Sequence, residues 1–562
     1  YPVFTRGNVG EVISAVVSPL AWSAYGPYSW ELGWRDGLCE MGVFTPEEFK
    51  PEGQCEVVGC FGGYVYINMS VTRVLAVRVP GLTTEAIDKS FFGDYPDVPP
   101  YRPDPRDQNV ERSAQASVWL ISLFSADPKP VTDQDRVRVD ALIAQRPDPA
   151  TQSDLQLLDH FRFLRAPNRQ IFKRHVLNTY GCNVLTSVIA QICQEVGAGD
   201  HAAKITAAIG DVDSARQSFE LWELSRKVKS MPMLAANFSE GVNGLLGRLR
   251  ASSDQAAQRF LADWDAFIDR WGFIGPNVWE FRSPTYRTNP EIPLRMLERA
   301  CLAPDSSAPA LRAAQLGAER QIAIAEVAGR LAGNPETRDQ FMGAARSAGS
   351  YLAARERSKM NCTLVIEEGR AALRELGRRL VRREQLPRWE HLLLVTDDEA
   401  NAFIANPAAY RGLIAERAEQ MEMLEAKEPP FVFEGVPPPL SAFKDRRRAK
   451  VEIALAGTQL RGIGVSPGRH TGRARVITSL TTESDLEPGE VIVAITTDAS
   501  WGPLFLAAGA VVVETGAAIS HAAIVSRELG IPAAVSVADA TRRISDGSTI
   551  TVDGNTGTVM VH

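Results

Sequence analysis

The pattern of hydrophobic and polar positions changes at about residue 428. From about 108 to 426, apolar residues recur at helical spacing, and the pattern is interrupted near Pro276 and Pro284. From about 461 onward, short Val/Ile/Ala runs separated by glycine indicate strands, as at 474–477, 491–495 and 550–552. The sequence therefore predicts a large, mainly helical region followed by a smaller α/β unit.

The first 110 residues and the segment around 428–460 fit neither pattern. Residues 61–68 alternate like a strand, and 96–105 are proline-rich and irregular. Residues 428–460 contain two proline clusters and a charged run with Arg446-Arg447-Arg448, a composition typical of a semi-rigid, solvated spacer. We expect a multidomain protein: a mostly helical domain over 1–427 with an irregular/β N-terminal part, a linker over 428–460, and an α/β domain over 461–562.

The composition and charge of the chain exclude some classes of binding partner. A chain of 562 residues is too long to fold around a single hydrophobic core. Its formal net charge is -7, whereas nucleic-acid-binding proteins usually carry an excess of basic residues. Its seven cysteines are scattered without paired metal-ligand spacing, so we expect reduced thiols and no metal site. Without an apolar run near about 18 residues or a leader-like start, we expect a cytoplasmic protein with no membrane or nucleic-acid partner.

The segment around His521 carries the clearest candidate chemistry. Residues 511–513 predict a buried strand, 516–518 a turn, and 521–529 a helix that begins after the cap-competent Ser520. Free backbone N–H groups and the helix dipole favour a phosphate at such a helix start. An exposed His521 is therefore suited to carry a phosphoryl group, although a purely structural histidine fits the same local pattern.

Several motifs in order extend this interpretation from Gly462 to the C-terminus. They are GVSPG at 464–468, TTDASW at 496–501, AAGA at 507–510, the His521 segment and VDGNTG at 552–557. This stretch resembles the phosphohistidine swivelling domain of phosphoenolpyruvate synthase, pyruvate phosphate dikinase and rifampin phosphotransferase. The resemblance implies that His521 is the phosphoryl carrier.

A second group of motifs lies in the larger region. They are FTRGNVGEV at 4–12, SPLAWS at 18–23, RERSK at 355–359, ELGRRL at 375–380 and LVTDDE at 394–399. Their order resembles that in the substrate-binding domain of rifampin phosphotransferase and its relatives. The resemblance therefore extends, more weakly, over nearly the whole chain.

Arg355 and Lys359 are the candidate basic residues of this region. They lie four apart, so both cations share one helical face, and an anion between them would relieve their repulsion. By spacing alone a solvated face is an open alternative, with Glu356 neutralising Lys359. The resemblance implies instead that Arg355 and Lys359 act at the transfer site, and it assigns no role to Arg357.

One segment departs from the relatives. Where they carry Gly-His-Arg-Gly-Pro-Gly-Glu, this chain reads GFIGPNV at 272–278, so polar side chains are replaced by apolar ones. Trp271, Phe273 and Trp279, with Phe281, are candidates for an apolar acceptor pocket, and a plain core role is the open alternative. We name no metal ligand.

The reaction that we expect depends on which domains are not recognised in the sequence. We see no ATP-grasp domain and no GxxxxGK[S/T] loop, and the 41 residues after His521 fall short of the roughly 250 of a TIM barrel. We therefore expect ATP and Mg²⁺ to be bound by a separate ATP-grasp partner subunit. The chain resembles the substrate and phosphohistidine subunit of phenylphosphate and 4-methylphenyl (p-cresyl) phosphate synthases.

That resemblance implies a dikinase-type reaction in which a phenol and ATP yield an aryl phosphate, AMP and phosphate. In it, the β-phosphoryl group passes through His521. The alternatives are transfer to another hydrophobic alcohol, such as an antibiotic, and a catalytically degenerate phosphohistidine protein with a regulatory or binding role.

Overall fold

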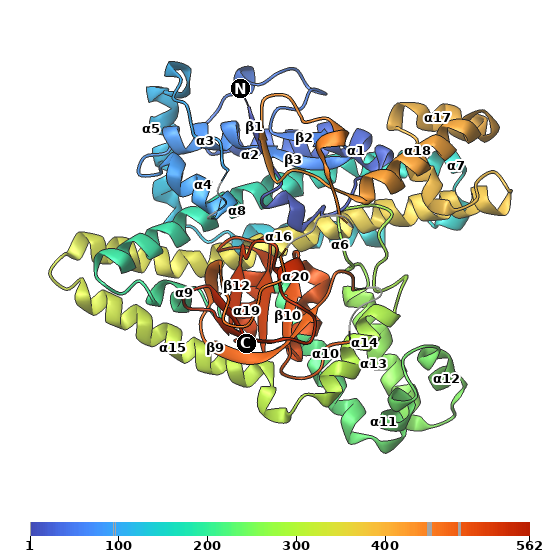
Figure 1. Cartoon of the computed structure of the whole chain (residues 1–562). Helices are drawn as coiled ribbons and strands as arrows, with labels where there is room; N and C mark the ends of the chain where they lie inside the picture. The colour runs from blue at the N-terminus through green and yellow to red at the C-terminus, as the bar shows by residue number, and fades with distance from the viewer. Residues whose placement is uncertain (1, 94, 96, 447–451, 481–484) are drawn as a thin grey trace. The chain divides into compact units, whose positions relative to one another are not determined.

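The computed structural model describes residues 2–93, 95, 97–446, 452–480 and 485–562, and the chain divides into two compact units (Figure 1). Unit 1 comprises Tyr1–Leu185, Trp279–Ser283 and Ser350–Lys450. Unit 2 comprises Thr186–Val278, Pro284–Gly349 and Val451–His562. Helices from the range predicted as one domain, 1–427, thus belong to both units.

Two long helices supply much of unit 1. They are α8 (Arg165–Glu195), up to Leu185, and α16 (Pro335–Arg382), from Ser350 onward. The shorter helices of unit 1 are α1 (Pro19–Tyr25), α2 (Glu31–Glu40), α3 (Met69–Arg78), α4 (Thr84–Phe92), α5 (Val110–Leu123), α6 (Lys129–Ala144), α7 (Asp154–Phe163), α17 (Asp397–Ala405) and α18 (Arg411–Glu425). The predicted helical character of this region is confirmed.

A four-stranded antiparallel sheet of order β2-β3-β1-β5 forms the β part of unit 1. Its strands are β1 (Val3–Thr5), β2 (Val58–Phe61), β3 (Tyr64–Asn68) and β5 (Val432–Glu434). The alternation predicted a single strand over residues 61–68. In the structure this range contains the end of β2, a turn and β3. Gly62 and Gly63 adopt positive φ angles of 58° and 77°, which turns the chain between β2 and β3 into a tight hairpin.

The predicted spacer is also more structured than its composition indicates. Strand β5 pairs antiparallel with β1, and Phe433 is buried against the rings of Phe4, Phe61 and Tyr66. Strands β4 (Lys427–Glu428) and β6 (Lys444–Asp445) form a further pair. The spacer prediction is therefore wrong for 432–434, because aromatic burial outweighs the neighbouring prolines. Residues 447–451, with Arg447 and Arg448, lie outside the described residues, as does Pro96.

Unit 2 contains an eight-stranded sheet of order β7-β14-β13-β9-β10-β11-β12-β8. The strands are β7 (Gln459–Arg461), β8 (Ile463–Ser466), β9 (Arg469–Val476), β10 (Val491–Ala494), β11 (Ala510–Val513), β12 (Ala533–Val535), β13 (Thr549–Asp553) and β14 (Thr558–Val561). Strands β9, β10, β11 and β12 run parallel to one another, whereas β9 pairs antiparallel with β13 and β12 pairs antiparallel with β8. The carboxyl ends of β10 and β11 therefore meet at one sheet edge, a usual ligand position in α/β folds.

The helices of unit 2 include α19 (His521–Leu529), which follows β11, and α20 (Ala540–Arg543). Both are drawn with the red and orange strands in Figure 1. The others are α9 (His201–Ile205), α10 (Asp213–Ser230), α11 (Pro232–Ser239), α12 (Leu245–Ala251), α13 (Gln255–Trp271), α14 (Glu291–Leu302) and α15 (Pro309–Arg330). The strands predicted at 491–495 and 550–552 are confirmed within one residue, whereas the strand predicted at 474–477 is the end of β9, which begins five residues earlier at Arg469.

One helical stretch, 154–195, is long and apolar enough to cross a membrane by length and composition alone. Of its apolar window, 61% is buried inside the protein. A buried core helix passes the same test, so the stretch is weak evidence for a membrane span.

Candidate functional site

His521 is the first residue of α19, as predicted. The Ser520 hydroxyl accepts a hydrogen bond from the Ala523 N–H at 3.4 Å, and Gly530, with φ 67°, ends the helix. These two local signals explain why the helix spans His521–Leu529. The imidazole therefore lies at the N-terminus of a nine-residue helix, next to backbone N–H groups that favour anions.

The histidine ring is not exposed, contrary to expectation. His521 is 1% exposed. The Thr497 hydroxyl lies 3.1 Å from Nδ1 of His521, and the centroids of the Phe505 and His521 rings are 6.2 Å apart. Thr497 follows β10 while His521 follows β11, so the parallel pairing of these strands brings the two residues together. The TTDASW motif is visible in the sequence, but its contact with His521 depends on the tertiary structure.

The segment 272–278, where the chain departs from its relatives, contacts the same loop of unit 2. The N–H of Asn277 donates to Asp498 at 2.8 Å, and Asp498 also accepts from the Ser500 N–H at 2.9 Å. Asp498 thereby caps the 3₁₀ helix η10 (Ala499–Leu506). The segment thus supports the loop that carries Thr497.

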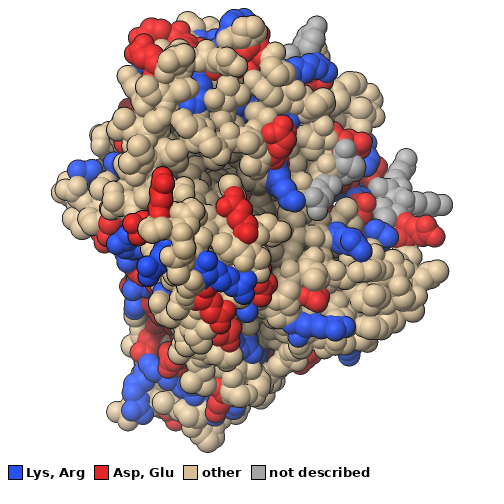
Figure 2. Space-filling view, turned by 90° about the vertical axis from the view of Figure 1, so that its left-hand side faces the viewer, with Lys and Arg blue, Asp and Glu red and all other residues tan. Residues whose placement is uncertain are grey.

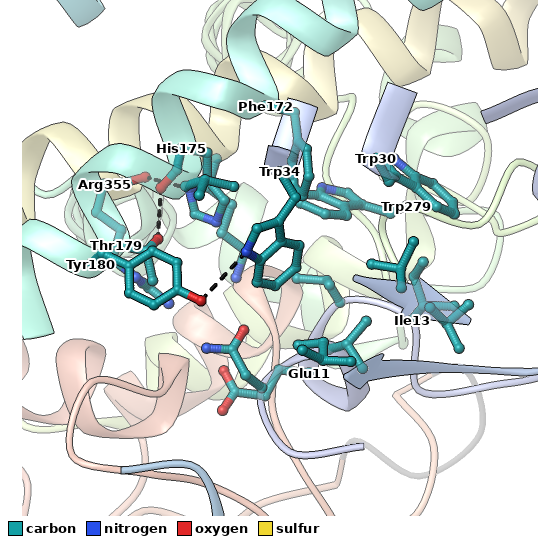
Figure 3. Close-up of a pocket in the computed structure, with 18 of the residues that line it drawn as sticks. Glu11, Ile13, Trp30, Trp34, Phe172, His175, Thr179, Tyr180, Trp279 and Arg355 are labelled. Carbon is teal, nitrogen blue, oxygen red and sulfur yellow. Dashed lines mark hydrogen bonds between the residues drawn. The ribbon is translucent and has the colours of Figure 1, made fainter. Parts of the chain in front are cut away.

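Unit 1 contains a cavity of about 760 Å³, part of it open to solvent. One face of α8 contributes six lining residues at helical spacing. The large aromatic side chains of the lining are Trp30, Trp34, Phe91, Phe172, Tyr180 and Trp279. Figure 3 shows several of them around the cavity, with the Trp34 indole N–H donating to the Tyr180 hydroxyl at 3.4 Å.

Of the four aromatic residues predicted for an acceptor pocket, only Trp279 lines this cavity. Trp271 and Phe273 belong to unit 2, where both are buried. The Trp271 indole N–H donates to Glu220 at 3.0 Å, and its ring centroid lies 6.5 Å from that of Phe273. Trp271 and Phe273 are therefore core residues of unit 2, which is the alternative that the sequence left open. Trp271 ends α13, and the apolar face of this helix is buried within unit 2. Phe281 packs against Tyr25 and Phe161.

Arg355 and Lys359 both line the cavity, as their spacing on one face of α16 predicts. They are 3% and 2% exposed, so the solvated-face alternative is wrong. Glu356 pairs with Arg355 rather than with Lys359, and Arg357 pairs with Asp133. Within the described residues, the Lys359 ammonium has neither an ion pair nor a hydrogen bond. A buried cation of this kind favours an anionic ligand.

His175 completes the polar side of the cavity. Its Nδ1 lies 3.3 Å from the Arg355 carbonyl oxygen and 3.3 Å from the Ser358 hydroxyl. Burial, followed by the positive charges of Arg355 and Lys359, lowers the pKa of His175 well below its usual value. The imidazole is therefore neutral at neutral pH. The sequence pattern does not single out His175, whose only signal is its place on the aromatic face of α8.

No group of three or more His, Cys, Asp or Glu side chains suited to hold a metal occurs in the described ranges. On the face drawn in Figure 2, basic and acidic side chains are interspersed. That face therefore has no broad surface of one sign.

Comparisons with known proteins agree with this arrangement. Residues 175–356 match the fourth domain of rifampicin phosphotransferase, and residues 486–557 match the mobile domain of PEP-utilising enzymes. These ranges contain His175 and Arg355 in the first match and His521 in the second. Over these two stretches the chain is thus similar to domains of rifampicin phosphotransferase and of PEP-utilising enzymes, and its architecture is multidomain, helical and α/β.

Individual relatives extend the similarity over the whole chain. An uncharacterised protein of Mycobacterium tuberculosis is 28% identical over 100% of this chain and 62% of its own length. The prodigiosin synthesizing transferase PigC of Serratia marcescens is 26% identical over 99% of this chain and 63% of its own length. A rifampicin phosphotransferase of Streptomyces is 30% identical over 64% of this chain and 41% of its own length. The chain thus spans less than two thirds of these relatives.

Proposed function

We propose that this chain carries a phosphoryl group on His521 and transfers it to the hydroxyl of a small aromatic acceptor, such as a phenol, held in the cavity of unit 1. One observation supports the proposal most directly. The cavity combines an aromatic lining with a buried Lys359 ammonium that lacks an anionic partner in the described part of the chain. Such a site suits a flat apolar ring with an oxygen that becomes anionic.

The chemistry of transfer follows from the charges. A phenol with a pKa near 10 is a weak nucleophile at neutral pH, and the Lys359 cation favours its phenolate form. Arg355 binds the oxygens of the transferring phosphoryl group. Transition states of this type need positioning and charge neutralisation more than covalent assistance. The buried basic pair on α16 supplies both.

Charging of His521 is the second half of the proposal. ATP and Mg²⁺ bind to a separate ATP-grasp subunit in the cytoplasm, and that subunit delivers the β-phosphoryl group to His521. The products are then AMP, phosphate and the aryl phosphate. The names of the relatives support the phosphotransferase class, while the subunit arrangement and the phenol are our own proposals.

A second candidate acceptor is a larger hydrophobic alcohol, such as an antibiotic. Two rifampicin phosphotransferases of Streptomyces, 30% and 32% identical to this chain over the matched regions, favour it.

The test mixes this chain with an ATP-grasp subunit, ATP labelled at the β-phosphate, and separate panels of phenols and antibiotics. We expect label on His521 that moves to a phenol. Formation of aryl phosphate by His521→Ala would refute the carrier role, and unchanged turnover in Lys359→Ala would remove Lys359 from the mechanism. Transfer only to an antibiotic would select the second candidate. A stable phosphoprotein that no acceptor discharges would instead indicate a regulatory or binding protein.

A further inference from the structure

We propose that His175 is the general base that removes the proton from the acceptor hydroxyl during phosphoryl transfer. This inference rests on the proposed function and adds a residue to its mechanism. It starts from the hydrogen bonds of the imidazole, which determine which ring nitrogen carries the proton.

The surroundings of Nδ1 select one tautomer. A carbonyl oxygen only accepts hydrogen bonds, so the contact of 3.3 Å between Nδ1 and the Arg355 carbonyl requires a proton on Nδ1. The Ser358 hydroxyl donates to the same carbonyl at 2.9 Å, which leaves its oxygen to accept from Nδ1 as well. In a neutral ring the other nitrogen, Nε2, then has its lone pair available.

The cavity makes that lone pair accessible. His175 lines the cavity, and Nε2 has no hydrogen-bond partner among the described residues. The His175 ring lies 6.0 Å from the Trp279 ring and 6.2 Å from the Phe172 ring, centroid to centroid. An aromatic acceptor that packs against these rings brings its hydroxyl to the imidazole edge. The backbone contact from α16 holds the imidazole in place.

The charges around His175 couple its basicity to the arrival of the phosphoryl group. The charged side chains that line the cavity are Glu11, Arg355 and Lys359. Burial and, after it, the charges of Arg355 and Lys359 lower the pKa of His175 and keep it unprotonated before the reaction. A phosphoryl anion between them offsets their charge, so the imidazole becomes a stronger base when the transfer requires it.

The step balances without another reactant. The acceptor oxygen forms a bond to phosphorus while the bond between phosphorus and the His521 nitrogen breaks, and that nitrogen keeps the electron pair. The hydroxyl proton moves to Nε2 of His175, and the freed nitrogen of His521 takes up a proton from water, which restores its neutral imidazole. Afterwards the proton returns to solvent through the open side of the cavity.

The test uses His175→Asn, because the asparagine amide can still donate to the Arg355 carbonyl while the basic nitrogen is lost. The full chain is phosphorylated at His521 with phosphoramidate, and single-turnover transfer is measured at pH 7.5 with phenol and with 4-nitrophenol, which ionises near neutral pH. We expect about a 100-fold slower transfer to phenol, the range of general-base effects. Transfer to 4-nitrophenol should fall less than about threefold, because its proton is already lost.

The ratio of the two rates within one variant cancels any loss of folded protein. Equal losses with both acceptors, or an unchanged rate with phenol, would overturn the role of His175. His160→Asn is the matched control: His160 lies on α7, outside the cavity lining, and burial also lowers its pKa. The control should leave both rates unchanged. If phosphorylated wild-type protein transfers to neither acceptor, the proposed function fails instead.

Discussion

Replacement of Lys359 by methionine is expected to stabilise the protein while it impairs transfer. Lys359 is 2% exposed and has no anionic partner within the described ranges. A buried ion costs several kcal/mol, and solvent at the open side of the cavity reduces that cost to about 1–3 kcal/mol. Methionine has a similar length and leaves little empty volume. For a unit of this size, about 2 °C per kcal/mol predicts a Tm increase of about 2–6 °C.

The same substitution removes the charge that the proposed transfer requires. Loss of one such electrostatic contact slows a reaction by about 10²–10³. Inorganic phosphate at about 100 times its Kd should stabilise the wild type by about 2.7 kcal/mol and stabilise Lys359→Met much less. The assays are thermal unfolding at low salt with and without phosphate, and single-turnover transfer from phosphorylated His521.

A matched control separates this effect from a general response to lost charge. Lys173 on α8 pairs with Glu40 at 2.7 Å. Lys173→Met should therefore lower stability by about 0–1 kcal/mol. The reasoning is refuted if Lys359→Met is less stable than the wild type, or if it transfers phosphate at the wild-type rate.

Three further predictions concern other residues. Thr497→Val removes the hydroxyl at His521 Nδ1 and should slow phosphohistidine formation at least about tenfold by labelling, with little change in Tm. Hydrogen bonding from Arg417 lowers the pKa of Glu399 from 4.5 to about 2, so its stabilisation is present above pH 4.5 and is lost as pH falls through about 2. After allowance for solvent screening, Glu399→Gln should lower the free energy of unfolding by about 1 kcal/mol at pH 7. Urea unfolding of the wild type and the variant should show that this difference disappears at acid pH. Burial raises the pKa of Cys60 to about 12, so iodoacetamide at pH 8 should label Cys60 only after unfolding, as mass spectrometry can check.

The local parts of the site were predictable from short stretches of sequence. Ser520 and the apolar run before it determine where α19 begins, because a helix cap acts within three residues. Arg355 and Lys359 share a face because four residues make about one helical turn. Burial was not predictable in this way. His521 was expected to be exposed, and Arg355 and Lys359 would have suited a solvated face equally well.

The cavity of unit 1 shows most clearly what the sequence pattern does not predict. Trp271 and Trp279 are eight residues apart, yet one is buried in unit 2 and the other lines the cavity of unit 1. His175 meets Arg355 although 180 residues separate them. No periodicity encodes such pairs, because they depend on how long helices pack.

The sequence alone therefore determined most of the helices and of the C-terminal strands, the place of His521 at a helix start and the shared helical face of Arg355 and Lys359, since backbone hydrogen bonds and caps act over a few residues. The tertiary structure decided which side chains are buried, that Glu356 pairs with Arg355 while Lys359 is left without an anionic partner in the described ranges, and that His175 joins them. These outcomes depend on packing and on the exclusion of water between segments distant in sequence.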